Sequence, residues 1–291
     1  MNTEFDQHFV HDADFIDLHL DLKTGGDVRV DLSELPGHAG LHLRASNTVD
    51  FALVDARLQD GVLKVDVPPL LSPDAPGPAF AFAAGDFSIT RGSTVTVDAV
   101  ITLPSASNVA VRTRAGDIFV QGSAGRITAK TESGDISVED CDHIQATTGS
   151  GDLRIAATSS GGVLTTGSGD ISAQPCPGKL KAQTGSGDVR VASAGHDARI
   201  TVSTGSGDVV ATLDGGALEA RTGTGDVLVR VLEGLPVWLD LSAPLGDISQ
   251  HLDAHGAPGE AEHYASITAR TGTGDITVTR FAHPGSEDAT T

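Results

Sequence analysis

The sequence predicts an all-β protein whose main part is a single-stranded parallel β-solenoid, or β-helix. Three observations predict it. A phrase built on Gly-Asp recurs nine times between Asp117 and Asp275 of the 291 residues. Apolar and polar residues alternate on both sides of that phrase, which is typical of strands and not of helices. The chain has only 9 Phe, one Trp, one Tyr and one Met, so its core must be thin and built from small aliphatic side chains.

The repeats have a period of about 18 residues, with longer insertions toward the C-terminus. The steps between successive Gly-Asp aspartates are 18, 17, 18, 18, 20, 18, 21 and 28. These aspartates are Asp117, Asp135, Asp152, Asp170, Asp188, Asp208, Asp226, Asp247 and Asp275.

Each repeat is expected to supply two strands that face one interior. The parity of the apolar positions changes across the Gly-Ser-Gly segment, as it must where the chain turns a corner and keeps one face inside. A lone repeat is too small to be stable, whereas stacked repeats share strand hydrogen bonds and a continuous interior. Around Asp188, the inward positions are Leu180, Ala182, Thr184, Val189 and Val191.

Three regions follow in order along the chain. Residues 1–108 are expected to form an N-terminal β cap with opening rungs around Asp27 and Asp86. This cap also holds a hairpin over 51–67 that turns at Asp60-Gly61, and a Pro-rich loop over 68–79. Residues 109–280 form the solenoid of GSGD(I/V) repeats, with a surface loop in QHLDAHGAPGEAEHYA before the last repeat, and residues 281–291 form a flexible tail.

The net charge and the composition of individual segments limit the classes of partner that the protein can bind and the cellular compartment in which it is expected. The 19 Lys and Arg against 39 Asp and Glu give a formal net charge of −20, which opposes binding to nucleic acid or to anionic lipid. The acidic N-terminal stretch lacks the pattern of a secretory signal, and the chain has no apolar run long enough for direct membrane insertion. Cys141 and Cys176 are too few for a disulfide framework. A cytoplasmic protein is expected.

Several segments together carry a resemblance to a known family. These are the GSGD(I/V) ladder, VTVDAVITLPSASNVAVRTRAGDI, VWLDLSAPLGDISQHLDA and SITARTGTGDITVTR. Over roughly residues 10–281 the chain resembles the bacterial "putative adhesin" family of β-strand-repeat proteins of unknown function. The resemblance implies a single-chain parallel β-helix with a role in binding or scaffolding. It supplies no catalytic motif.

The Asp column is the most conspicuous candidate site. Outward carboxylates about 4.8 Å apart repel one another, so something must stabilise them. We expect each to accept a backbone N–H from its own or the adjoining Gly-rich corner, which makes the column a structural turn ladder. The alternative is a calcium ladder, although calcium-binding β-rolls place their Asp two residues after Gly and twice over the length of one such repeat.

Other polar columns are expected to be structural as well. Hydroxyls of an inward Thr column should bond corner backbone groups, and no base accompanies them to make a nucleophile. The pairs His8/His11, His38/His42 and His251/His255 have metal-like spacings only on a helix, so we expect exposed polar residues and no metal site. The Thr column is Thr113, Thr131, Thr148, Thr166, Thr184, Thr204, Thr222 and Thr271. Outward bases five residues before an Asp are read as charge compensation: Arg112, Lys130, Arg221 and Arg270.

These features predict a non-catalytic interaction or scaffold protein with no cofactor, whose partner is an unknown protein or glycan. The acidic residues are spread evenly and do not converge, which argues against an enzyme. The alternatives are a carbohydrate-binding or carbohydrate-active β-helix, a calcium-binding repeat protein, and an acidic mimic of DNA. Self-association through the solenoid ends is expected at the C-terminal rung, Ser266 to Arg280. Cys141 and Cys176 should occupy equivalent positions two rungs apart and stay unpaired.

Overall fold

The computed structural model describes residues 2–10, 12, 14–33, 38–70, 80–84, 87–91, 95–252 and 264–282. Within these ranges the chain is all-β: 22 strands belong to one sheet, two form a separate sheet, and a 3-10 turn, η1 (Phe51–Leu53), is the only helical element. None of the described residues forms a helix that could cross a membrane. The chain divides into a first unit, residues 1–141 with 146–148, and a second unit, residues 142–145 with 149–291. Strand β12 (Ile136–Ser150) contributes residues to both units.

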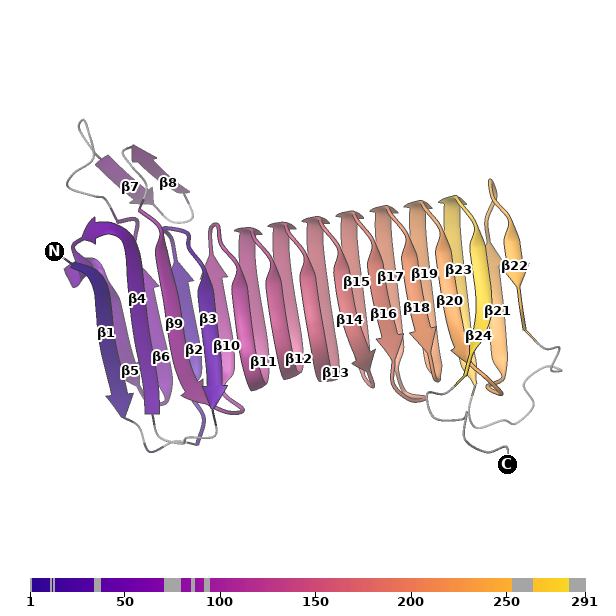
Figure 1. Cartoon of the computed structure of the whole chain (residues 1–291), viewed down its shortest axis with the longest axis horizontal. Helices are drawn as coiled ribbons and strands as arrows, with labels where there is room; N and C mark the ends of the chain where they lie inside the picture. Colours follow the sequence, from indigo (N-terminus) through magenta and orange to yellow (C-terminus); the bar gives the residue numbers. More distant parts are fainter. Residues whose placement is uncertain are drawn as a thin grey trace, which may run out of the picture. The chain divides into compact units, whose positions relative to one another are not determined.

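The second unit is built from two parallel strand ladders (Figure 1). Aligned residues in neighbouring strands lie 18 or 20 positions apart, as in Leu180 with Ile200 and Ile200 with Leu218. One ladder contains β13 (Leu153–Ser168), β15 (Lys179–Ser186), β17 (Arg199–Ser206) and β19 (Gly216–Thr224). The other contains β14 (Ile171–Cys176), β16 (Val189–Ser193), β18 (Val209–Leu213) and β20 (Val227–Leu232). We call two successive strands and the corner between them a rung.

The core lies between the two ladders, because every second side chain of each strand points inward. The five inward positions predicted around Asp188 are all buried, with exposures of 0 to 6%. The same alternation gives aliphatic columns with no large aromatic ring, as the composition requires. The predicted parity change at the corner is confirmed, because Thr184 and Val189 both face inward on either side of it.

The C-terminal strands do not follow the order of the sequence. The last two, β23 (Ala265–Thr273) and β24 (Ile276–Phe281), pair on one side with β19 and β20. On the other side they pair with β21 (Val237–Ser242) and β22 (Ile248–Gln250). Figure 1 shows β24 between β20 and the terminal β21 and β22. The prediction that Ser266 to Arg280 forms the free end is therefore wrong, because the chain doubles back and inserts its last repeat one rung inside.

The first unit shows the same inversion. One parallel ladder runs in the order β6 (Val62–Val67), β2 (Asp17–Leu22), β10 (Asn108–Thr113) and β11 (Ile118–Ser133). The other runs from β9 (Val97–Pro104) through β3 (Val28–Ser33) to β11. The repeat around Asp27 is thus a rung, as predicted, but it lies one position inside the outer rung formed by β6 and β9.

Antiparallel strands follow beyond that outer rung. β4 (His38–Val49) pairs with β9 and with β1 (Asn2–Val10), and β5 (Asp55–Gln59) pairs with β6. The predicted hairpin turn is confirmed, with φ of 52° at Asp60 and 79° at Gly61. Positive φ at both central residues is the geometry that Asp-Gly favours in two-residue hairpins.

The second predicted opening rung, around Asp86, is not part of the stack. β7 (Phe80–Ala84) and β8 (Phe87–Arg91) pair antiparallel in their own two-stranded sheet. Two residues between alternating strands favour a hairpin over a solenoid corner, which explains the difference. Asp86 itself, residues 71–79 of the Pro-rich segment, residues 253–263 of the C-terminal insertion and residues 283–291 of the tail lie outside the described residues.

Candidate functional site

The Asp column forms a continuous set of backbone contacts in each unit. Along each unit, the Oδ1 atom of one rung's aspartate accepts the backbone N–H of the aspartate in the next rung, over 2.8 to 3.1 Å, and among the described residues Asp247 at the end of the second unit only donates. In the first unit the acceptors Asp98, Asp27 and Asp117 bind Asp27, Asp117 and Asp135. In the second unit the order is Asp152, Asp170, Asp188, Asp208, Asp226, Asp275 and Asp247. The predicted contact of a carboxylate with a corner N–H is seen for seven of the nine aspartates: Asp117, Asp152, Asp170, Asp188, Asp208, Asp226 and Asp275.

Two features of this Asp ladder differ from the sequence expectation. The order Asp226, Asp275, Asp247 follows the inserted last repeat and not the sequence. The ladder also begins at Asp98, which no glycine precedes and which the Gly-Asp search therefore missed. The only signal for Asp98 is its place in an alternating strand.

The Thr column supplies the complementary half of each corner. Each of the eight predicted threonines is 1 to 6% exposed and donates its hydroxyl to the carbonyl oxygen of the Gly that precedes the ladder Asp in the neighbouring rung. These bonds measure 2.9 to 3.3 Å. The predicted structural role is confirmed.

Glycine is required at the corner for two reasons, which Gly187 illustrates. Its φ is +139°, a conformation that side-chain-bearing residues rarely adopt. A Cβ there would lie 2.1 Å from the carbonyl oxygen of Gly169, the atom that also accepts the Thr184 hydroxyl. The Gly-Asp repeat is thus dictated by close approach of successive backbones.

Arginine side chains moderate the charge of the Asp ladder. Arg154 lies 2.6 Å from the Asp152 carboxylate and Arg190 lies 3.3 Å from that of Asp188, and each arginine follows its aspartate by two residues. Two of the four bases predicted to compensate charge pair with other carboxylates: Arg221 pairs with Glu219, and Arg270 lies 3.3 Å from Asp240. These exposed pairs each contribute little to stability.

This arrangement is suited to holding a backbone and not to chemistry. The Oδ1 atoms are already bound by neutral N–H groups, and each Thr hydroxyl is buried against a carbonyl. Among the described residues no group of three or more His, Cys, Asp and Glu side chains is arranged to hold a metal ion. His8, His38 and His251 are exposed, His42 contacts Asp6 through Nδ1 at 2.6 Å, and His11 and His255 lie outside the described residues.

Both cysteines are buried and neither forms a disulfide, which agrees with the prediction that they are not bonded to each other. Burial raises the pKa of the Cys176 thiol above its ordinary value, and a hydrogen bond with the Gly178 backbone opposes this shift without cancelling it. A buried thiol with a raised pKa has little of the thiolate form that reacts.

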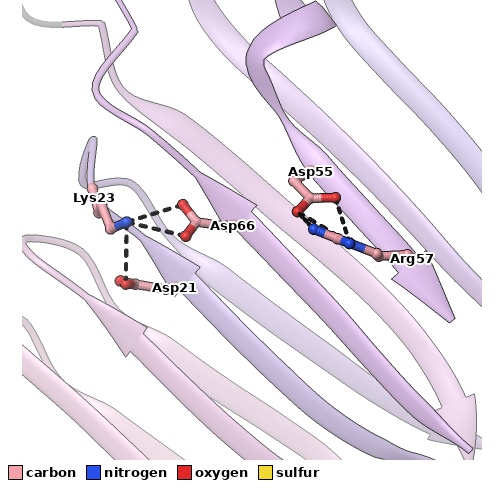
Figure 2. Close-up of polar contacts among 5 residues, drawn as sticks. All are labelled: Asp21, Lys23, Asp55, Arg57 and Asp66. Carbon is pink, nitrogen blue, oxygen red and sulfur yellow. Dashed lines mark hydrogen bonds and ion pairs between the residues drawn. The ribbon is translucent and has the colours of Figure 1, made fainter. Parts of the chain in front are cut away.

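A second group of charged side chains lies in the first unit, where the sequence analysis placed no site. The Lys23 amine lies 3.1 Å from both carboxylate oxygens of Asp66 and 3.7 Å from Asp21 (Figure 2). Partial burial lowers the pKa of Lys23, but the hydrogen bond and charge of Asp66 and then of Asp21 outweigh it and leave the pKa raised.

An exposed ion pair lies on β5, the strand that pairs with β6. Arg57 binds both carboxylate oxygens of Asp55 (Figure 2). The hydrogen bond lowers the pKa of Asp55 and raises that of Arg57.

Comparison with known proteins identifies a family. The model of the Toastrack DUF4097 family matches residues 81–279. No curated protein matches the chain. Among solved structures, a "putative lipid binding protein" from Parabacteroides distasonis ATCC 8503 is 10% identical with a TM-score of 0.42, and 96% of this chain and 97% of that one are covered. A "putative adhesin" from Parabacteroides merdae ATCC 43184 is 12% identical with a TM-score of 0.41, and 96% of each chain is covered.

Proposed function

The chain belongs to the Toastrack DUF4097 family, and we propose that it is a non-catalytic interaction protein that self-associates through its terminal rung. One observation carries the proposal. Among the described strands, β21 and β22 pair only on their inner side, with β23 and β24. The exposed apolar side chains of this rung include Leu245 at 74% and Trp238 at 56%. An uncovered strand edge is a template for pairing with another chain.

The proposal treats each repeat as a rung of about 18 residues and the antiparallel N-terminal strands as a cap. The register that aligns Leu180 with Ile200, and Ile200 with Leu218, supports the first point. The antiparallel pairing of β4 with β9 and of β5 with β6 supports the second.

The free edge of β21 has a defined set of backbone groups. The Ala265 N–H donates to the carbonyl of Pro236, so the backbone carbonyl of Pro236 points toward β23. Because these groups alternate along a strand, those of Val237, Leu239 and Leu241 point to the free edge. The side chains of the same three residues are half-buried over the interior.

A second copy of the chain fits this edge by antiparallel pairing about a two-fold axis at Leu239. Two copies of Leu239 then exchange both backbone hydrogen bonds, and Val237 lies opposite Leu241 in the same bonded register. In this register Trp238 of one copy lies opposite Asp240 of the other copy. A two-fold axis at Asp240 would instead oppose two carboxylates. Asp240 is also compensated by Arg270 within its own copy.

Sedimentation over a range of protein concentration tests the proposal, and the single Trp gives an independent signal at the interface. We expect a monomer–dimer equilibrium that strengthens with monovalent salt, because salt screens the −20 charge. Trp238 emission should shift to shorter wavelength as the dimer forms.

Leu239→Pro is the decisive variant. It removes an outward N–H that no described strand uses, and edge strands tolerate Pro. We expect this variant to be a folded monomer, while Leu239→Ala, which keeps the N–H, retains a weakened dimer. A wild-type protein that stays monomeric at about 100 µM, or a dimer unaffected by Leu239→Pro, would contradict the proposal.

We also propose a cytoplasmic location. Its support is that both cysteines are buried and outside any disulfide, which suits a reducing compartment. Recovery of the native protein in the envelope fraction of the source cell would contradict it.

A further inference from the structure

The outer face of the first unit carries a depression of about 390 Å³ across β6, β2, β10 and β11. We propose that it binds an acidic oligosaccharide, that is, a sugar chain bearing carboxylate groups. The inference concerns a different surface from the terminal rung and stands independently of self-association.

Strand register builds the depression from two rows of outward side chains. The first row is Lys64, His19, Ala110 and Thr128, and the second is Asp66, Asp21, Arg112 and Lys130. Ala110 is the smallest of these residues and sits in the third strand, so the longer side chains around it form the rim. A shallow trough about three strand spacings wide, roughly 14 Å, results.

The rim is positive although the protein is strongly acidic. Lys23 binds Asp66 and Asp21, so one cation already compensates the two carboxylates in part. Lys64, Arg112 and Lys130 add three more positive charges within the same trough. Among the described residues, the Lys130 side chain makes no ion pair or hydrogen bond. A positive trough on a chain of net charge −20 favours an anionic ligand at this place.

The position of the cations sets the spacing of the ligand's charges. Arg112 and Lys130 are aligned on neighbouring strands, about 4.8 Å apart, so a ligand carboxylate that binds the Lys130 amine also lies close to the positive charge of Arg112. Lys64 lies two strands from Arg112 and three from Lys130, on the other side of Ala110. A ligand with at least two acidic groups separated by a neutral stretch fits this pattern better than a single small anion.

The carboxylates of Asp21 and Asp66 select hydroxyl groups between those charges. Both line the trough, and they accept hydrogen bonds but repel anions. The middle of the ligand must therefore donate hydrogen bonds, which sugar hydroxyls do and the phosphodiesters of a nucleic acid backbone do not. No Phe, Tyr or Trp side chain is among the residues that line this trough, so recognition depends mainly on charge and hydroxyl contacts and not on stacking against a large ring.

Calorimetric titration with trigalacturonic acid tests the site in the full chain. We expect saturable binding that is lost when the carboxyl groups of the same trisaccharide are methyl-esterified. Lys64→Met with Lys130→Met should weaken binding at least tenfold, because two charge-assisted contacts are lost. Lys181→Met, an exposed lysine on the second unit, is the matched control and should leave affinity unchanged.

Each other outcome would overturn the proposal. Equal binding of the methyl ester would exclude recognition by charge, and equal loss in the Lys181→Met control would show nonspecific attraction. Displacement by millimolar inorganic phosphate as effective as that by the trisaccharide would indicate a simple anion site. If the wild-type protein has the circular dichroism of a folded β protein and still does not bind the trisaccharide, the proposed site does not exist.

Discussion

The outer rung of the first unit and the terminal rung of the second unit differ in how their outer strand edges are covered. Both lie outside a repeat that the chain inserts one position inward, Asp27 in one case and Asp275 in the other. In the first unit, β4 and β5 then cover the outer rung by antiparallel pairing. In the second unit no described strand covers β21 or β22. The comparison shows that a change of strand direction covers the end of one parallel stack, whereas among the described residues the other stack has no such cover.

The largest effect is expected at an interior corner. Gly187→Ala places a Cβ 2.1 Å from the Gly169 carbonyl oxygen at φ +139°, and should lower the free energy of unfolding by about 3 kcal/mol or more. Gly195→Ala is the control, since Gly195 has φ +86° but open space around it, and should cost about 1 kcal/mol.

Gly246→Ala extends this test to the terminal rung. Its Cβ would lie 1.9 Å from the Gly274 carbonyl oxygen, but Gly246 is in the corner between β21 and β22, which has a neighbouring described rung on one side only. Strands at an open end can shift locally, so we expect a smaller loss than for Gly187. Equal losses in urea denaturation of the two variants would show that the terminal rung is held as firmly as the interior.

The Asp ladder gives a second contrast between interior and end. Asp188 accepts the Asp208 N–H at 2.9 Å, whereas the Asp247 carboxylate accepts no backbone N–H from the described residues. Asp188→Ala should therefore cost about 1 kcal/mol, and Asp247→Ala should change stability by less than about 0.5 kcal/mol. Higher stability of Asp188→Ala would show that repulsion between carboxylates outweighs the turn contact.

The sequence predicted the rungs well because their determinants are local. Alternation identified the buried positions, and Gly-Asp with Thr identified the corner whose bonds the structure shows. The sequence did not predict the order of the strands at the two ends, because similar repeats can pair with one another in any order. Only the long connections, such as residues 34–107, allow the chain to double back. The trough around Ala110 was missed for the same reason, since residues 19, 64, 110 and 128 meet only through that order.

An interior thiol provides a smaller, pH-dependent effect. Cys176 is 0% exposed, and burial raises its pKa above the ordinary value of 9.0. A raised pKa in the folded state means that the unfolded chain ionises first, so the free energy of unfolding should fall as pH rises above about 9. The decrease is at most about 1.4 kcal/mol per pH unit and should disappear in Cys176→Ala.

Thiol titration completes this test. The native protein should react with neither thiol at pH 7, and the denatured protein should show two. Rapid reaction of Cys176 in the native protein would mean that the interior rungs open as readily as the terminal rung. The proposed difference in local stability between the interior and the end would then be wrong.

The smallest effect is expected from calcium. A calcium site needs six to eight oxygen ligands, but the Oδ1 atoms of the Asp ladder already accept backbone N–H groups along both units. Calcium should therefore raise the melting temperature by less than about 1 °C beyond sodium chloride of equal ionic strength, which only screens the carboxylates. If free carboxylates at the terminal rung did bind calcium, Asp247→Ala would lower the calcium effect and Asp188→Ala would not. A rise of several degrees that a chelator reverses and that Asp188→Ala abolishes would instead restore the calcium ladder as the role of the column.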